Sequence, residues 1–186
     1  KQNKQQTVPH QTEETKNPAE GPKKQYIYMR ITNKGQPHAT IKIQLDEDCP
    51  LMAENFKALC LNTFGFGYRK SVFHRVCKNE FIQGGDFECG MGLGGYSIFG
   101  ARFRPEKNDK RLYAQSICMV LDDEGMASSD FVICLGRCDF LQERCVAFGM
   151  VLDGFDDLRF VDRLGVDPFG GVEDLRIDEC SEQKLM

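Results

Sequence analysis

The sequence predicts a β-dominated domain, either a sandwich or a barrel, that carries two short helices. Residues 63–151 hold short apolar runs separated by glycine-rich turns, a pattern typical of many short strands. Alternating runs at 26–32 and 39–45 flank a turn that contains Asn, Gly and Pro, which predicts a hairpin. Two segments with helical apolar spacing, 50–62 and 154–165, interrupt the strands.

The length and composition indicate one domain with an attached tail. The chain has 186 residues, of which 41% are apolar, enough to fill one sizeable core. Residues 1–24 are mostly polar, charged or proline, which predicts a disordered linker or tail before a domain over 25–186. Because the chain begins with Lys1 rather than methionine, we interpret it as a piece of a larger protein in which the domain is monomeric.

Charge, hydropathy and cysteine usage narrow the functional classes. A net charge of −4 argues against general nucleic-acid binding, and no apolar run reaches the roughly 18 residues of a membrane span. The nine cysteines are odd in number and lie mostly in apolar runs, which indicates reduced thiols in the cytosol or nucleus. Only Cys134 and Cys138 are closely spaced, and no histidine is near them, so no metal site is predicted.

Each element has a local signal. The first helix is expected over 50–61, with Asp48 as N-cap and Pro50 in the first turn. Its apolar face is formed by Leu51, Phe56, Leu59 and Cys60. The second helix is expected over 155–164, with apolar residues at steps of three and Gly165 as its stop. A last run, 172–180, is positioned to close the sheet. The interior is expected to hold Phe56, Phe73, Phe87, Ile133 and Phe148.

Six stretches in order carry a family resemblance. They are AENFKALC (53–60), GFGYRKSVFHRVCKNEFIQGGDF (65–87), GLGGYSIFGARF (92–103), FVIC (131–134), LQERCVAFGMVLDG (141–154) and the ending RIDEC. Together they resemble the cyclophilins, a family of peptidyl-prolyl cis-trans isomerases, over residues 26–181. The resemblance implies a closed eight-stranded antiparallel barrel with a helix covering each end. HRV, FVI and DEC are similar to the cyclophilin domain of a large Ran-binding nuclear-pore protein, which implies a cytoplasmic or nuclear location, at the nuclear pore.

The implied reaction is rotation about an X–Pro peptide bond, whose resonance sets a barrier of about 20 kcal/mol. An arginine lowers it by donating a hydrogen bond to the prolyl nitrogen as that atom pyramidalises. The resemblance gives this role to Arg75, and it gives Gln83 the task of holding the substrate carbonyl and orienting the arginine. The alternative for Arg75 is a surface arginine on a strand. His74 is interpreted as a buried fold histidine, because no proton moves and no metal or cofactor is required.

The resemblance also implies a proline pocket, in which several side chains depart from the family pattern. Its substrate-binding residues are Glu80, Phe81, Val120, Leu121, Val132, Phe140, Leu141 and Cys145. Leu141 matches the family. Phe81 replaces methionine and preserves apolar bulk, whereas Val132 replaces phenylalanine and leaves a wider, shallower floor. Val120 replaces alanine, Phe140 replaces tryptophan and Cys145 replaces histidine.

Glu80 is the largest departure, because phenylalanine is usual at its position. A buried carboxylate is costly unless it is paired, so two arrangements stay open. Glu80 pairs with Arg75 and competes for its hydrogen bonds, or it turns outward while Phe81 fills the gap.

Two functions follow from these residues. The first is an isomerase of reduced efficiency that acts on a proline-containing segment of a client protein. The second is a catalytically weak module that only binds such segments. A structural domain without a peptide ligand would require the groove to be closed. Cyclosporin, the family's macrocyclic ligand, is expected to bind weakly at most, because Phe140 lacks an indole N–H.

Overall fold

The computed structural model describes residues 24–185 and consists mainly of strands. The strands are β1 (Gln25–Asn33), β2 (Gln36–Leu45), β3 (Phe73–Cys77), β4 (Phe81–Gly84), β5 (Ser116–Leu121), β6 (Ala127–Cys134), β7 (Cys145–Asp153) and β8 (Leu175–Ser181). The helices are α1 (Pro50–Cys60), α2 (Phe155–Leu158) and 3-10 helices at Asp139–Leu141 and Arg159–Arg163. The prediction of a disordered tail over 1–24 lies outside the described residues, Lys24 excepted. None of the helices described is long and apolar enough to cross a bilayer.

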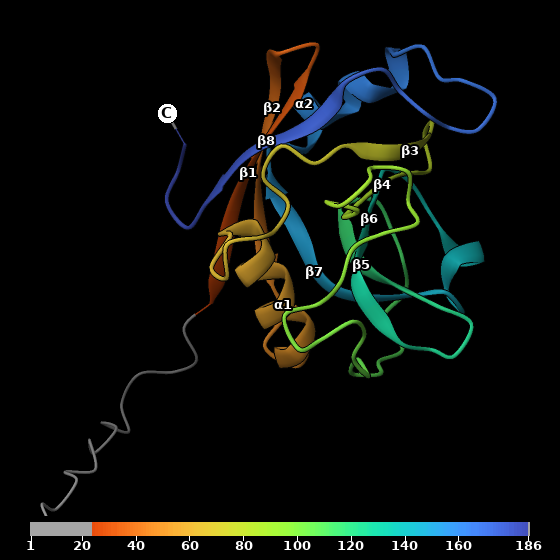
Figure 1. Cartoon of the computed structure of the whole chain (residues 1–186). Helices are drawn as coiled ribbons and strands as arrows, with labels where there is room; N and C mark the ends of the chain where they lie inside the picture. The colour runs from red at the N-terminus through yellow and green to blue at the C-terminus, as the bar shows by residue number, and fades with distance from the viewer. Residues whose placement is uncertain (1–23, 186) are drawn as a thin grey trace, which may run out of the picture.

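All eight strands form one antiparallel sheet that curls into a nearly closed barrel (Figure 1). The order is β3-β4-β6-β5-β7-β2-β1-β8, so β3 and β8 are its two edges. The chain just before β3 joins these edges. Lys70 N–H donates to the Ile177 carbonyl (2.7 Å), and Ile177 N–H donates to Ser71 (3.0 Å). The barrel is therefore confirmed over the sandwich, and the last strand closes it as predicted.

The barrel interior takes most of the side chains expected there. Phe56, Phe73, Ile133 and Phe148 are at most 1% exposed and pack in one cluster. Phe87 is an exception, since it is only partly buried. It follows β4 in irregular chain, stacks against Phe66 at a ring distance of 5.8 Å and contacts Tyr96 edge-on at 4.9 Å. The prediction that Phe87 lies in the interior is therefore wrong.

Helix α1 begins at Pro50 as expected, but its cap differs from the prediction. Cys49, not Asp48, occupies the N-cap position and makes no side-chain capping bond. Instead the Glu106 carboxylate accepts hydrogen bonds from the N–H groups of Leu51 and Met52. An acidic group at a helix N-terminus is stabilising wherever it lies in the sequence, so local pattern cannot reveal this cap. Leu51, expected on the apolar face, is 42% exposed.

The second helix is shorter than predicted. Only Phe155–Leu158 is α-helical, Arg159–Arg163 is a 3-10 helix, and the chain is extended at Leu164, before Gly165. Apolar residues at steps of three are compatible with both an α-helix and a 3-10 helix, so the spacing alone does not decide which of the two forms. In Figure 1, α1 lies at the lower end of the barrel and α2 near its upper end. The run GGYSIFG (94–100) forms a loop with a single bridge between Ser97 and Gly100.

Candidate functional site

The outer face of the barrel carries a second apolar cluster, separate from the interior. Side chains on β6 alternate, so Phe131 and Ile133 face the interior while Val132 and Cys134 face outward. The outward cluster consists of Phe81, Leu112, Cys118, Val132, Cys134, Cys138, Cys145 and Ala147, flanked by Cys77, Val120 and Leu141. Most of the predicted pocket residues meet here.

A bulge in β3 brings Arg75 to this face. Phe73 pairs with Gly84 and Arg75 pairs with Gln83, so His74 is an extra residue on the β3 side. Residues two apart on a regular strand share a face, which would place Phe73 and Arg75 together. The bulge separates them: Phe73 is buried in the interior and Arg75 is exposed. The bulge thus lets Phe73 point into the barrel interior while Arg75, two residues later, points to the outer face.

The Arg75 guanidinium stands over an aromatic ring. Its Cζ lies 5.3 Å from the centroid of the Phe81 ring. In residues 24–185, no carboxylate lies within 4.0 Å of the guanidinium nitrogens. The N–H donors of Arg75 are therefore available to a ligand, and the ring beneath them restricts water to one side.

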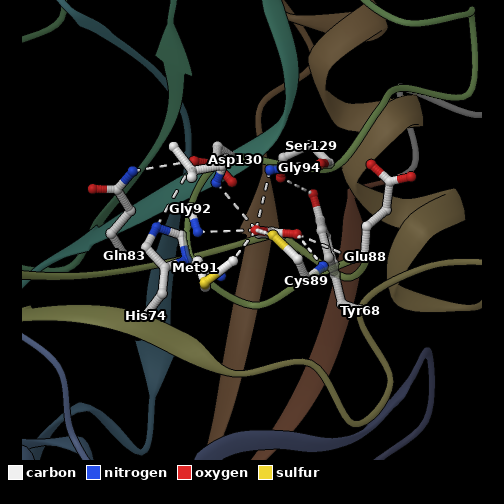
Figure 2. A network of polar contacts seen from close by, with 12 residues as sticks. Tyr68, His74, Gln83, Glu88, Cys89, Met91, Gly92, Gly94, Ser129 and Asp130 are labelled. Carbon is white, nitrogen blue, oxygen red and sulfur yellow. Dashed lines mark hydrogen bonds and ion pairs between the residues drawn. The ribbon is translucent and has the colours of Figure 1, made fainter.

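Gln83 lies next to Arg75 and is held from its other side. It pairs with Arg75 across β3 and β4, and with Val132 across β4 and β6. Its Nε2 donates to Oδ2 of Asp130 on β6 (3.2 Å). Figure 2 shows the Gln83 amide with its nitrogen toward Asp130 and its oxygen turned away.

Asp130 and His74 form a buried polar pair behind Gln83. Their side chains are 15% and 7% exposed, and His74 Nε2 lies 3.9 Å from Asp130 Oδ2 (Figure 2). Burial raises the pKa of Asp130 to about 6; the Gln83 hydrogen bond opposes this rise and the nearby Asp86 charge adds to it. Burial also lowers the pKa of His74. Both groups therefore favour their neutral forms more than they would in water.

The pocket residues differ in how far a ligand can reach them. Phe81 and Val132 are each 2% exposed and Cys145 is 3% exposed, so they form a covered floor. Phe140, on the 3-10 helix Asp139–Leu141, is 59% exposed and its ring centroid lies 6.2 Å from that of Phe81. Val120 and Leu141 are half-buried against the outer cluster.

Leu121 lies apart from these residues. It packs against the main core, while its neighbour Val120 packs against the outer cluster. Successive residues of a strand face opposite sides, which explains the separation.

Glu80 adopts the outward arrangement. Its side chain is exposed and makes no ion pair with Arg75. Its backbone is fixed by the chain after β6, because its carbonyl accepts hydrogen bonds from Leu135 N–H (2.7 Å) and Gly136 N–H (3.1 Å). Phe81, the next residue, fills the floor instead.

Two acidic residues near the site have structural roles that sequence reasoning did not find. Asp130 holds Gln83, but its sequence context is only an acidic loop before a strand. Asp86 organises the loop 88–94, and its signal is its position shortly before the glycine-rich stretch that begins at Gly90. Such a carboxylate accepts backbone N–H groups of a turning loop, a contact that the glycines Gly92 and Gly94 permit.

The cysteines contribute apolar bulk to the site. All nine are free thiols, and Cys118 and Cys134 approach to 3.9 Å between sulfurs in the outer cluster. Burial raises the pKa of the Cys145 thiol to about 12, so it stays neutral. Across the part of the chain that the structure describes, no three His, Cys, Asp or Glu side chains are grouped to hold a metal ion.

Comparison with known proteins agrees with this architecture. Residues 26–182 match the family model described as cyclophilin type peptidyl-prolyl cis-trans isomerase/CLD. Over 159 residues, 84% of this chain, the sequence is 35% identical to the E3 SUMO-protein ligase RanBP2 of Homo sapiens. It is 34% identical over the same length to the RanBP2 of Pan troglodytes. The matched segment spans 5% of the length of each of these relatives.

Proposed function

The chain belongs to the family of cyclophilin-type peptidyl-prolyl cis-trans isomerases, and we propose that it binds X–Pro segments of a client protein and catalyses their isomerisation with reduced efficiency. One observation carries this proposal: Arg75 is exposed beside Gln83 and above an apolar floor, and it has no ionic partner within residues 24–185. This arrangement suits an arginine that acts on a neutral amide.

The chemistry follows from loss of amide resonance. As the X–Pro bond twists, the prolyl nitrogen regains its lone pair and becomes a better hydrogen-bond acceptor. The Arg75 guanidinium, which has no acceptor capacity of its own, donates to that nitrogen more strongly in the twisted state than in the planar state. Gln83 Nε2 donates one N–H to Asp130, and we assign its second N–H to the substrate carbonyl. The apolar floor strengthens both contacts by limiting solvent.

The covered floor supports the reduced efficiency. Because Phe81 and Val132 are nearly inaccessible, a proline ring would contact the outer edges of the floor and the exposed Phe140. A shallow contact provides less binding energy for the twisted state. The same observation favours the second candidate, a module that binds proline-containing segments with little turnover.

One experiment separates these two functions. Cis–trans exchange of a panel of X–Pro peptides is measured by NMR exchange spectroscopy with the chain present, alongside backbone amide shifts of the chain. Rate enhancement together with binding supports the isomerase. Binding without rate enhancement selects the binding module, and neither effect would contradict both.

The aromatic ring of the floor offers a first mutational prediction. The usual methionine and phenylalanine are replaced by Phe81 and Val132, so the ring has moved from β6 to the adjacent β4. Cores tolerate swaps that conserve volume and resist added bulk. Val132→Phe alone should therefore destabilise the domain by about 1–3 kcal/mol. Combined with Phe81→Met, it should regain most of that stability and raise kcat/KM above the wild-type value.

Urea unfolding and kcat/KM are measured for four proteins: the wild type, Phe81→Met, Val132→Phe and the double variant. Comparison of the single variants with the double variant gives the coupling between the two positions. Glu80→Phe is the matched control, and it should leave kcat/KM unchanged because Glu80 faces solvent. The prediction fails if Val132→Phe is as stable as the wild type and the double variant has no higher kcat/KM. This result would show that the side chains at 81 and 132 do not pack in the same space.

Cyclosporin binding gives a second prediction. Phe140 presents an exposed ring without an N–H donor. The cyclosporin acceptor that hydrogen-bonds to a tryptophan N–H in other members of the family is therefore left unpaired here. An unmet partner costs about 1–3 kcal/mol, which corresponds to roughly 5- to 150-fold in affinity. Phe140→Trp should tighten binding by that range in a calorimetric titration. Wild-type affinity equal to that of the tryptophan variant would contradict the assigned contact.

We further propose that the domain is part of a larger chain at the nuclear pore, on its cytoplasmic side. The support is the similarity to RanBP2, of which this chain matches only a small part. Immunofluorescence of the full-length protein tests the location, and diffuse staining away from the nuclear envelope would overturn it.

A further inference from the structure

The carboxylate behind Gln83 occupies an unusual environment. Asp130 is 15% exposed, and one of its oxygens, Oδ1, is buried without a hydrogen-bond partner. Both ring nitrogens of His74 and the Ser129 hydroxyl are likewise buried and unpartnered. Among residues 24–185, the one hydrogen bond to the carboxylate comes from the Gln83 amide. A buried carboxylate with so little support is sensitive to protonation.

A glutamine amide can present either end to its surroundings. An ionised carboxylate accepts hydrogen bonds only, so it selects the Nε2 end of Gln83 and turns Oε1 away (Figure 2). Asp130 lies on β6 and Arg75 on β3, on opposite sides of the strand that carries Gln83. The oxygen thereby released is on the side of the Arg75 guanidinium, which has only donors to offer.

We propose that Asp130 is a positioning residue for Gln83, and that protonation of Asp130 lets the Gln83 amide reverse and turn its NH₂ group toward Arg75. A protonated carboxyl can donate its O–H to Gln83 Oε1, which makes the reversed amide acceptable on the Asp130 side. On the other side, NH₂ then meets the guanidinium, and two donors face each other. The reversed state no longer offers Arg75 the acceptor through which Gln83 is proposed to orient it.

The groups around Asp130 allow its carboxylate to gain and lose a proton near neutral pH. His74 approaches from β3, Gln83 from β4 and Asp86 from the chain after β4. Tyr68, before β3, donates its hydroxyl to the Ser129 carbonyl (2.7 Å) and not to Asp130. In residues 24–185, no lysine or arginine pairs with the Asp130 carboxylate. The raised pKa of Asp130, about 6, brings its titration close to neutral pH.

The inference rests on the proposed isomerase function only for its effect on rate. Side-chain amide resonances of Gln83 are followed by NMR in the isotope-labelled chain from about pH 5 to about pH 7.5. In the wild type they should shift with the same midpoint as the Asp130 carboxyl carbon. In Asp130→Asn the shift should disappear. A Gln83 midpoint that follows the His74 ring protons instead would overturn the proposal.

The rate supplies a second readout. Below the midpoint, kcat/KM of the wild type for an X–Pro peptide should fall several-fold, because the acceptor for Arg75 is lost. Asp130→Asn should give a flat profile, whereas His74→Gln, folded as judged by its backbone spectrum, should keep the fall. A fall that persists in Asp130→Asn contradicts the positioning role. If no variant has isomerase activity, the proposed function fails, while the Gln83 resonances still decide this inference.

Thermal melting provides an internal check on the protonation site. Folding raises the pKa of Asp130 above its unfolded value, so the folded state binds more protons between about pH 4 and 6. Stability from this group is therefore lost as pH rises through that window. Asp130→Asn should melt above the wild type at about pH 7.5, and the difference should shrink at about pH 4. An equal difference at both values would assign the titration to another group.

Discussion

Replacing Arg75 by alanine should lower kcat/KM for an X–Pro peptide by about 100-fold or more while the fold stays intact. The side chain donates to a nitrogen that becomes a good acceptor only in the twisted state, and removing one such donor typically costs about 10²–10³ in rate. Stability should change little, because Arg75 is exposed and its main contact is the Phe81 ring. A surface cation–π contact is worth about 0.5–1 kcal/mol, or a few degrees in Tm.

Arg75→Lys is the matched control for this experiment. Lysine keeps the positive charge but lacks the planar fork of donors, so it should recover only a small part of the lost rate. Peptide affinity, read from amide shifts, should change less than the rate in both variants. Wild-type rates in Arg75→Ala would remove Arg75 from its assigned role.

Local pattern predicted the elements of this fold but not their ends. The hairpin, α1 and the closing strand β8 follow from alternation, from Pro50 and from apolar runs, all of which are local signals. The cap of α1 escaped prediction because it comes from Glu106, far along the chain. The second helix was mistaken in type because its step of three suits both helical readings until packing decides.

The candidate site was likewise predicted only in part. Motif resemblance brought Arg75 and Gln83 together, and the strand pairing places them side by side. Sequence alone left the Glu80 rotamer open, because the side chain's direction depends on how the chain after β6 fixes its backbone. The contact between Asp130 and Gln83 joins residues 47 positions apart, so it required the barrel itself. The bulge at His74, which turns Arg75 outward, has no local signal that we can identify.

The loop beside the site offers the largest expected effect on stability. Asp86 is 1% exposed, and its Oδ2 accepts N–H groups of Met91, Gly92, Leu93 and Gly94 at 2.9–3.2 Å. Its Oδ1 accepts N–H groups of Glu88 and Cys89 at 3.0 Å. Burial opposes ionisation, but the hydrogen bonds from the Cys89 thiol and the loop N–H groups outweigh it and hold the pKa of Asp86 well below its usual range.

Asp86→Ala should therefore destabilise the domain by about 3 kcal/mol or more, since hydrogen bonds to a charged group contribute about 1.5–3 kcal/mol each and several are lost together. Urea unfolding measures the loss. Glu88→Gln is the control in the same loop. Glu88 is exposed and accepts a hydrogen bond from the Gly95 N–H (2.7 Å), so its replacement should cost about 0.5 kcal/mol or less.

The pH dependence of Asp86→Asn identifies the charge as the cause. A depressed folded pKa stabilises the protein above the unfolded value of about 4, and this stability is lost as pH falls below it. The gap in unfolding free energy between wild type and Asp86→Asn should therefore narrow from about pH 7 to about pH 3. Loosening of the loop should also reach the site, because Gly92 packs against the His74 ring next to Arg75. A gap that stays constant with pH would mean that shape, and not the ionised carboxylate, holds the loop in place.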